Sequence, residues 1–393
     1  MEYLLEGIMA VTWQQVVMWV IGAVLIYLAI KKGLEPALLL PMGFGAILVN
    51  IPLSGAIGST ANGDLQNGII EWLFEVGIEA SEALPLLLFI GIGAMMDFGP
   101  ILSNPKLMLF GAAAQFGIFA TILIASVIPG FEDIKDAASV GIIGAADGPT
   151  AILVSQVLKS DYVGPIAVAA YCYMALVPIV QPIVMKLCTT KKERMIRMEY
   201  NAQNVSRATR IIFPIGVTLI AGLVAPASVS LVGFLMFGNL IRECGVLNSL
   251  KEEASNHLSN LITLLLGITI SFSMKAEAFL SLQTIAIMGL GLLAFVFDTF
   301  GGIMFAKLIN LFTKKKINPL VGAAGISAFP MSCRVVQKVG LEADPTNHLL
   351  MHAAGANVAG QIASVVAGGV ILGLVPKMVA AAGALGGFLC LLF

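Results

Sequence analysis

The sequence predicts an all-α polytopic membrane protein, with about ten to eleven transmembrane helices in two inverted repeats, each with a re-entrant hairpin. Composition and hydropathy favour this fold. The 393-residue chain is 58% hydrophobic and only 11% charged, whereas soluble domains carry about 25% charged residues. Its mean hydropathy is +0.95. Apolar runs that could cross a hydrocarbon core of about 30 Å recur along the whole length, so no soluble domain of independent size remains.

The apolar runs define the candidate spans. The first run ends in Lys31 and Lys32 rather than at a small-residue cleavage site, so it predicts a retained helix and not a cleaved signal. The segment 66–82 separates an apolar helical face from four glutamates, which is typical of a helix lying in the membrane interface. The expected spans are 12–30, 36–53, 84–97, 106–129, 162–187, 208–225, 228–242, 259–273, 281–312, 345–374 and 376–393.

Two further stretches carry Gly and Pro in the middle of an apolar run. They are SVGIIGAADGPTAILVSQVL (139–158) and NPLVGAAGISAFPMSCRVVQKV (318–339). Irregular backbone at membrane depth is tolerated only where it is buried in protein or lines a wet cavity. Both stretches are therefore predicted to be re-entrant hairpins.

The distribution of Lys and Arg predicts the orientation. With the N-terminus outside, only Lys135, Lys159, Lys275 and Lys377 fall outside. Those that fall inside are Lys31, Lys32, Lys106, the 186–210 cluster, Arg242, Lys251, Lys314 to Lys316 and Lys338. The first hairpin then enters from outside and the second from inside. The basic stretch 186–210 is explained by this topology and by anionic lipid headgroups, so no nucleic-acid partner is expected. The five cysteines show no paired spacing, so neither a disulfide nor a metal cluster is indicated.

Three pairs of segments indicate an internal repeat. Segment 84–102 resembles 260–280, segment 115–120 resembles 299–306, and segment 144–158 resembles 322–339, each about 180 residues apart. The predicted units are 1–190 with hairpin 139–158, 191–375 with hairpin 318–339, and a C-terminal helix 376–393. Copies with an odd number of spans have opposite topology, an arrangement that transporters use to build an ion site at mid-membrane.

Asp147 lies where the first hairpin should break, although a charged side chain at bilayer depth costs roughly 2.5 to 3.5 kcal/mol. A carboxylate among unpaired backbone carbonyls suits Na⁺ or a proton. The alternatives are a helix cap or a pair with an arginine. In the second hairpin, polar groups could complete such a site. Alternatively, they have only structural roles: Asn318 as a turn residue, Ser327 hydrogen-bonded to its own helix backbone, and Arg334 extending to the inner membrane interface. These candidates are Asn318, Gly322, Ser327, Ser332 and Arg334.

The helices that follow the two hairpins carry matching polar groups and should pack against them. Tyr173 could donate a hydrogen bond or proton, or simply pack. Asn357 could offer its side-chain carbonyl to a cation, or hydrogen-bond between helices. The two sets are Tyr171, Tyr173 and Gln181, and Asn357, Gln361 and Ser364.

Five long motifs carry a family resemblance. They are GIGAMMDFGPILSNPKLMLFGAAAQFGIFATI, GIIGAADGPTAI, AAYCYMALVPIVQP, NPLVGAAGISAFPMSCRVVQ and HAAGANVAGQIASVV, in this order over nearly the whole chain. With them the chain resembles the beta subunits of the sodium-pumping biotin-dependent decarboxylases, which serve oxaloacetate, methylmalonyl-CoA, glutaconyl-CoA and malonate decarboxylase complexes. The resemblance implies an enzyme subunit that decarboxylates carboxybiotin, consumes a proton and exports Na⁺.

The resemblance also implies cofactors, partners and residue roles. Na⁺ is the transported ion, and biotin is carried by a partner. The partners are a carboxyltransferase alpha subunit, a biotin carrier protein and a small gamma or delta membrane subunit, in the inner (cytoplasmic) membrane of a bacterium or archaeon; a homo-oligomer stays open. The implied Na⁺ ligands are Asp147, Asn318, Ser327 and Asn357, the catalytic residues Tyr173, Ser327 and Arg334, and the cofactor-binding residues Arg334 and Gly322.

Without the family resemblance, the residues leave a second functional class open. A stand-alone Na⁺-coupled secondary transporter of elevator-like inverted-repeat type, exchanging Na⁺ for a carboxylate or a proton, would show the same spans, breaks and buried Asp147. Co-purification with a biotinylated protein would favour the decarboxylase, and full transport by the isolated chain would favour the carrier.

Overall fold

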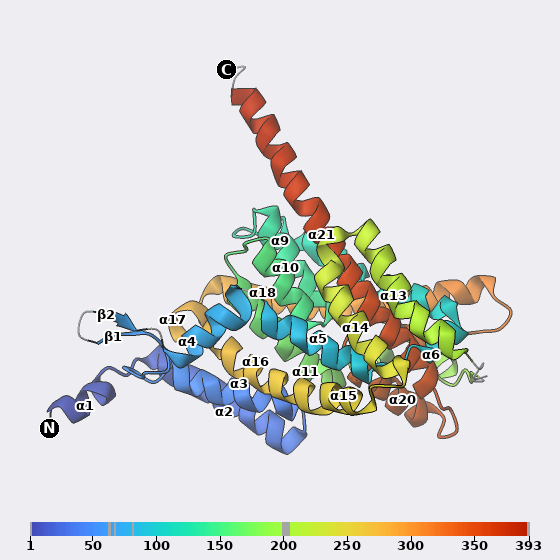
Figure 1. The fold of residues 1–393 in the computed structure, drawn as a ribbon, viewed down its shortest axis with the longest axis horizontal. Coiled ribbons are helices and arrows are strands. Elements are labelled where there is room, and N and C mark those ends of the chain that lie inside the picture. Colours follow the sequence, from blue (N-terminus) through green and yellow to red (C-terminus); the bar gives the residue numbers. More distant parts are fainter. Residues whose placement is uncertain (1, 62–63, 67, 81, 199–204, 391–393) are drawn as a thin grey trace.

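The computed structural model describes residues 2–390 except 62–63, 67, 81 and 199–204. The described chain is helical apart from one short antiparallel pair, β1 (Ser59–Ala61) and β2 (Asp64–Gln66) (Figure 1). The predicted all-α polytopic class is confirmed. The inverted repeat and the predicted division into units remain predictions.

Eight helical segments in the described part are long and apolar enough to cross a membrane, or nine if one bent pair is a single span. That pair joins Ile69–Glu79 to Ala83–Met95 at an angle of 65°. The predicted span 36–53 forms a shorter helix, Pro36–Val49. The eight segments are Trp13–Lys32, Pro105–Ala125, Val163–Cys188, Arg207–Val224, Pro226–Cys244, Asn248–Met274, Leu282–Phe312 and Leu350–Ala381.

The last two predicted spans form one continuous helix, α21 (Leu350–Cys390), which projects from the rest of the molecule at its C-terminal end (Figure 1). Pro376 lies inside this helix instead of separating two spans. Membrane helices tolerate Pro because one lost backbone hydrogen bond can be satisfied locally. Residues 391–393 of the predicted segment 376–393 lie outside the described residues.

Local signals define several helix ends. At the start of α2 (Trp13–Lys32), Thr12 and Gln15 form a capping box, and Gly33 ends the helix at a left-handed φ of 63°. The 31-residue α18 (Leu282–Phe312) begins at Ser281, whose side chain accepts a hydrogen bond from the Thr284 amide. Uncapped backbone groups would be costly in lipid, so these caps help fix where helices begin and end.

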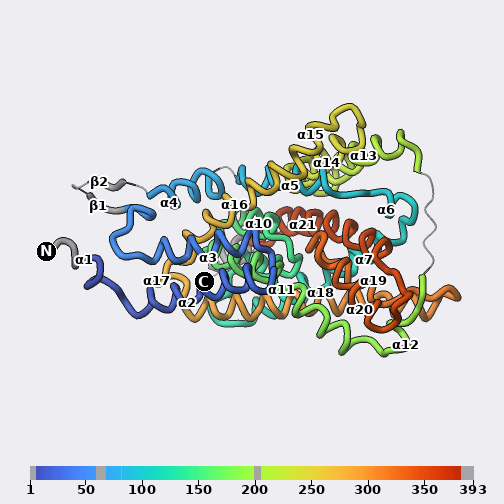
Figure 2. Tube along the Cα trace, turned by 90° about the horizontal axis from the view of Figure 1, so that it is seen from below, coloured from blue at the N-terminus to red at the C-terminus, as the bar shows by residue number. Residues whose placement is uncertain are grey.

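The helices form an outer group and an inner group. In the outer group, α2 packs beside α3 (Pro36–Val49), α3 packs on α16 (Ser259–Ile270), and α5 (Ala83–Met95) packs on α14 (Val229–Cys244), which contacts α13 (Arg207–Val224) (Figures 1 and 2). In the inner group, α18 packs on α11 (Val163–Cys188), α7 (Met108–Ala114) and α8 (Phe116–Ala125), and α21 packs on α7. Apart from the helices of the two hairpins, the remaining α-helices of the described chain are α1 (Glu2–Met9), α4 (Ile69–Phe74), α6 (Gly99–Ser103), α12 (Lys191–Arg194), α15 (Asn248–Glu252) and α17 (Ala276–Phe279).

The inner group encloses both predicted hairpins, and each is broken where the sequence indicates. The first consists of α9 (Ile134–Gly141), a 3₁₀ turn at Ile142–Ala145 and α10 (Gly148–Val157), with Ala146 at a positive φ of 53° between them. The second consists of α19 (Pro319–Ala323) and α20 (Met331–Ala343), joined by the non-helical segment 324–330. All residues in 136–155 and 318–328 are buried, as irregular backbone at membrane depth requires.

Candidate ion-binding site between the two hairpins

The tips of the two hairpins touch. The Ser327 amide, in the break of the second hairpin, donates a hydrogen bond of 3.1 Å to the carbonyl oxygen of Ala145 in the first. Asp147 follows two residues after Ala145 and precedes α10. The junction of the hairpins therefore lies beside the predicted ion ligand.

Asp147 is buried and hydrogen-bonded through one oxygen. Only 3% of the surface of Asp147 is exposed. Its Oδ2 accepts hydrogen bonds from Thr150 Oγ1 (2.7 Å), Gln361 Nε2 (2.8 Å) and Ser364 Oγ (3.1 Å). Hydrogen bonds to a charged group contribute about 1.5–3 kcal/mol each, which offsets part of the cost of burying the carboxylate.

No positive side chain neutralises Asp147 among the described residues. All nine ion pairs within 4.0 Å in that part of the chain involve other carboxylates. The alternative that Asp147 pairs with an arginine is therefore not what the structure shows. A buried carboxylate without a cationic partner is suited to bind a metal ion or a proton.

Helix α21 connects Asp147 to the second hairpin. Asn357 Nδ2 donates to the carbonyl oxygens of Ala324 (3.2 Å) and Ile326 (2.6 Å), and Ser327 Oγ donates to Gly360 O (3.2 Å). Gln361 and Ser364 lie on the next turns. The Oδ1 atom of Asn357 is buried and has no hydrogen-bond partner in the part of the chain that the structure describes. Three predicted ligands, Asp147, Ser327 and Asn357, are thus brought together along residues 357–364.

Asn318, the fourth predicted ligand, lies at the other end of α19. Its Oδ1 accepts from the Leu320 amide (3.1 Å), and its Nδ2 donates to the carbonyl oxygens of Arg194 and Ile196, both at 2.8 Å. These bonds cap α19 and hold the segment before it. The structure does not bring Asn318 into hydrogen-bond contact with Asp147.

Gly322 lies at a close helix crossing. A Cβ atom on Gly322 would be 2.1 Å from the carbonyl oxygen of Gly302 in α18. Only glycine permits this approach of α19 to α18. The geometry gives Gly322 a packing role, and its part in binding the cofactor stays a prediction.

The two tyrosines of α11 face different neighbours. The Tyr173 hydroxyl donates to the carbonyl oxygen of Met288 in α18. Tyr171 instead packs its ring on Gly148, where a Cβ atom would lie 2.4 Å from ring carbons. Its buried hydroxyl has no hydrogen-bond partner within the described chain. Tyr171 rather than Tyr173 is therefore the tyrosine next to Asp147.

Arg334 lies one turn into α20 with an exposed side chain and forms no ion pair within 4.0 Å among the described residues. Its charge acts on Glu35, which precedes α3. Burial raises the pKa of Glu35, and the positive charge of Arg334 opposes this increase. Arg334 thus lies on the side of the second hairpin that faces the start of α3, away from Asp147's hydrogen bonds.

Some residues at the site were not singled out by the sequence. Thr150 lies three residues after Asp147 at the start of α10, a spacing that brings side chains together on a helix. Asp298 is a second buried carboxylate, in the middle of α18. A charged residue inside the apolar run 281–312 was the available signal. By contrast, the expectation that Gln181 packs on a hairpin is confirmed, since its Nε2 donates to Ala323 O at 2.7 Å.

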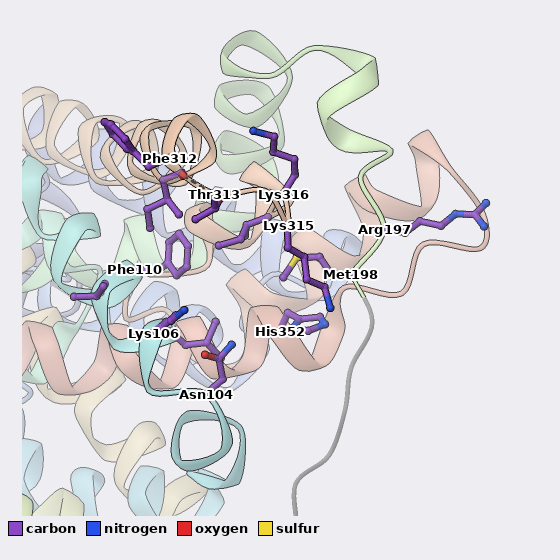
Figure 3. Close-up of a pocket in the computed structure, with 14 residues that line it drawn as sticks. Asn104, Lys106, Phe110, Arg197, Met198, Phe312, Thr313, Lys315, Lys316 and His352 are labelled. Carbon is purple, nitrogen blue, oxygen red and sulfur yellow. Dashed lines mark hydrogen bonds between the residues drawn. The ribbon is translucent and has the colours of Figure 1, made fainter.

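A pocket of about 640 Å³ opens near the second hairpin, between the start of α7, the end of α18 and the start of α21. Figure 3 shows Lys315 reaching toward His352, whereas Arg197 points away from the pocket. Arg197 pairs with Asp344 at 2.8 Å. Ile317, which precedes Asn318, also lines the pocket. The other basic lining residues are Lys106 and Lys316, so this is a basic pocket with an apolar floor that includes Phe110, Met198 and Phe312.

Comparison with known proteins identifies the family. Residues 14–375 match the family model described as Na⁺-transporting oxaloacetate decarboxylase beta subunit. The methylmalonyl-CoA decarboxylase subunit beta of Propionigenium modestum is 47% identical over 388 residues, covering 94% of this chain and 96% of that protein. The glutaconyl-CoA decarboxylase subunit beta of Acidaminococcus fermentans is 47% identical over 370 residues, covering 94% and 96%. The oxaloacetate decarboxylase beta chain of Klebsiella pneumoniae is 43% identical over 423 residues, covering 95% and 98%. The chain therefore belongs to the family of Na⁺-transporting decarboxylase beta subunits.

Proposed function

We propose that this chain decarboxylates carboxybiotin presented by partner subunits and couples the loss of CO₂ to Na⁺ export, with consumption of a proton. One observation supports the coupling most strongly: Asp147 is buried, lacks an ion pair among the described residues, and lies where the hairpins and α21 meet. Family membership favours this function over a stand-alone Na⁺-coupled carrier.

In this proposal Asp147 provides the charge of the principal Na⁺ site. Na⁺ is the transported substrate and prefers oxygen ligands. The hydroxyls of Thr150 and Ser364 can turn their lone pairs toward an ion, and Gln361 can present its carbonyl oxygen. The unpartnered Oδ1 of Asn357 is a further oxygen within the same cluster. A proton on Asp147 would replace the ion when the site is empty of Na⁺.

A second Na⁺ site is proposed at Asn318 and Ser327 of the second hairpin. Ser327 already contacts both the first hairpin and α21. Asn318 would have to give up bonds to the segment around Arg194 and Ile196 before it could bind an ion. This site therefore depends on a rearrangement at the start of α19.

The basic pocket is the proposed entrance for carboxybiotin. Its residues fit such a group, because a carboxylated ureido ring is an anion with an apolar edge and the pocket combines Lys106 and Lys316 with Phe110 and Phe312. When bound, biotin supplies a labile nitrogen–carboxylate bond that releases CO₂. Arg334 lies on α20 outside the residues that line this pocket, and it is proposed to hold the carboxylate by two-point hydrogen bonding after biotin has moved past the entrance. Gly322 packs on Gly302 of α18, so its proposed part in binding the cofactor requires α19 to move away from α18.

Hydroxyl groups of this chain are proposed to supply the proton that the reaction consumes. Ser327 and Tyr173 are the candidates, because a hydroxyl both accepts and donates hydrogen bonds. Transport additionally requires that the reaction change the relative Na⁺ affinity of the inward-open and outward-open states, since an equal effect on both would shift nothing. Movement of the hairpins against α18 and α21 would provide those two states.

The proposed partners are a carboxyltransferase alpha subunit, a biotin carrier protein and a small gamma or delta membrane subunit. The proposed location is the inner membrane of a bacterium or archaeon, with the N-terminus outside. These assignments rest on the names of the relatives and on the charge distribution of the loops.

The test measures how Na⁺ activates carboxybiotin discharge by the purified complex. Asp147→Asn should abolish Na⁺ activation, because the amide keeps the shape but removes the charge. Asp136→Asn is the matched control: Asp136 is a buried carboxylate in the same hairpin, hydrogen-bonded to Ser160 at 2.6 Å and distant from the tip. Ordinary Na⁺ activation in the Asp147 variant would contradict the proposal.

A further inference from the structure

Asp298 is a second carboxylate in the membrane interior that the proposed function does not use. It lies in the middle of α18, and the residue is only 1% exposed. In the described part of the chain, Asp298 has no ion pair within 4.0 Å. Burying an unpaired charge is expensive, so such a group is a candidate functional site.

The two oxygens of Asp298 have opposite surroundings. Oδ1 accepts a hydrogen bond of 2.5 Å from the Gly117 amide, and the Ile118 amide also acts on the carboxylate. These amides form the N-terminus of α8, a ten-residue helix whose dipole favours a negative charge there. Oδ2 is buried and has no hydrogen-bond partner among the described residues. The surroundings of Oδ1 thus favour a negative charge, whereas Oδ2 lacks a hydrogen-bond partner among the described residues.

The unpartnered oxygen is directed at the first hairpin. A Cβ atom on Gly144 would lie 2.7 Å from Asp298 Oδ2, 3.0 Å from the Ala294 methyl group and 3.4 Å from the Ile118 nitrogen. Gly144 lies three residues before Asp147. The same hairpin tip therefore has a buried carboxylate on each flank: Asp147 toward α21 and Asp298 toward α8 and α18.

The surroundings suit a proton better than a metal ion. Na⁺ requires several oxygen ligands. Apart from Asp298 Oδ2, the other two atoms nearest to the Cβ position of Gly144 are the Ala294 methyl carbon and the Ile118 nitrogen, and neither is an oxygen. A proton needs only the oxygen itself. The Thr121 hydroxyl, on the same face of α8 as Gly117 and one turn further along, is also buried and has no hydrogen-bond partner among the residues described. It is a neighbouring group through which a proton could reach the acid.

We propose that Asp298 is a proton-binding site distinct from Asp147, which takes up or releases its proton as the first hairpin moves against α18. This proposal rests on the proposed function only because it assumes that the first hairpin moves. Among the described residues, the titratable groups on elements that pack against this part of α18 include Asp147 after the hairpin tip, Tyr173 of α11, which lies against Gly291 about two turns before Asp298, and Lys135 and Asp136 at the start of α9.

The direct test labels the resting complex with dicyclohexylcarbodiimide, which modifies protonated carboxyl groups in apolar surroundings, and locates the product by peptide mass spectrometry. Asp298 should be modified increasingly as the pH is lowered, and Na⁺ should not protect it. Na⁺ should protect Asp147. The measurement needs no turnover, so its outcome is independent of whether carboxybiotin discharge is coupled to transport.

Two labelling results would overturn the proposal. Absence of modification at Asp298 at every pH, with Asp147 labelled, would show that Asp298 holds no exchangeable proton. Protection of Asp298 by Na⁺ to the same degree as Asp147 would make it a metal site instead.

A variant provides a second readout. Asp298→Asn keeps an acceptor for the Gly117 amide and so preserves the fold, but it cannot exchange a proton. We expect it to change the pH profile of decarboxylation while leaving the Na⁺ concentration for half-maximal activity within about twofold of wild type, whereas Asp136→Asn should alter neither. A merely structural role for Asp298 would instead lower activity uniformly across pH.

Discussion

At the scale of single residues, the position of Asp147 was predictable and its partners were only partly so. A carboxylate between small residues and a Gly-Pro break indicated an interior ion site. The sequence could not distinguish Tyr171 from Tyr173, because residues two apart on a helix face different sides and only packing decides which side meets the hairpin. Asp298 carried the same signal as Asp147, but it lies within an unbroken helical run.

The donors around Asp147 yield a prediction at this scale. Ser364→Ala removes one hydrogen bond to the buried carboxylate, and Gln361→Leu removes another. If these groups hold the Na⁺ site, each change should raise the Na⁺ concentration for half-maximal decarboxylation by about tenfold or more, since such a bond contributes about 1.5–3 kcal/mol. Ser139→Ala, which removes only a bond to Lys135 O within α9, is the control. An unchanged Na⁺ response in both test variants would exclude these residues from the site.

At the scale of elements, the hairpin breaks were predictable because Gly and Pro limit backbone conformation locally. Which helices the breaks would touch was not, because the contacts depend on tertiary packing. Thus Asn318 caps α19 and bonds to Arg194 and Ile196, while Asn357 bonds to the carbonyl oxygen of Ile326 in the break of the second hairpin. Pro376 shows the opposite case: proline usually ends a helix, yet Pro376 lies within the continuous helix α21.

The packing of the second hairpin on α21 depends on a close approach between their backbones. A Cβ atom on Gly360 would lie 2.1 Å from Gly325 O. Gly360→Ala should therefore lower the thermal unfolding temperature of the detergent-solubilised complex and impair activity, because overpacking costs about 1–3 kcal/mol. Gly289→Ala in α18, where no atom of the described residues lies within 4 Å of the added atom, should be harmless. Equal unfolding temperatures for the two variants would contradict this packing.

The ion pair between Arg197 and Asp344 should make stability pH-dependent. The hydrogen bond from Arg197 lowers the pKa of Asp344 to about 2. A carboxyl with a depressed folded-state pKa stabilises the fold above its unfolded pKa of about 3.9, and this contribution is lost as the pH falls toward 2. Asp344→Asn should slightly lower the unfolding temperature at neutral pH, and the difference from wild type should vanish near pH 2. Glu132→Gln, at an exposed carboxylate, should show no such convergence; a deficit in the Asp344 variant that persists at acid pH would have another cause.

At the scale of the whole molecule, composition was sufficient to predict a polytopic membrane protein, and family membership accounts for its motifs. The number of spans was less predictable, since short helices such as Pro36–Val49 and bent pairs depend on how neighbours cover them. Both hairpins pack on α18 from within the inner group, an arrangement compatible with two halves of opposite topology.

The predicted orientation is testable with reporters in two loops. A reporter active only in the cytoplasm should function after α18, next to Lys314, and one active only outside should function at Gly130, before α9. The basic residues of the loop after α18 should keep that loop inside. The reverse pattern would invert the directions from which both hairpins are proposed to enter.

The central claim is that carboxybiotin discharge drives Na⁺ through the junction of the two hairpins at Asp147. The most direct measurement is uptake of radiolabelled Na⁺ into proteoliposomes that contain the reconstituted complex, with carboxybiotin as the only energy source. Wild type and Asp136→Asn should accumulate Na⁺, and Asp147→Asn should not. Undiminished accumulation by the Asp147 variant would contradict the account.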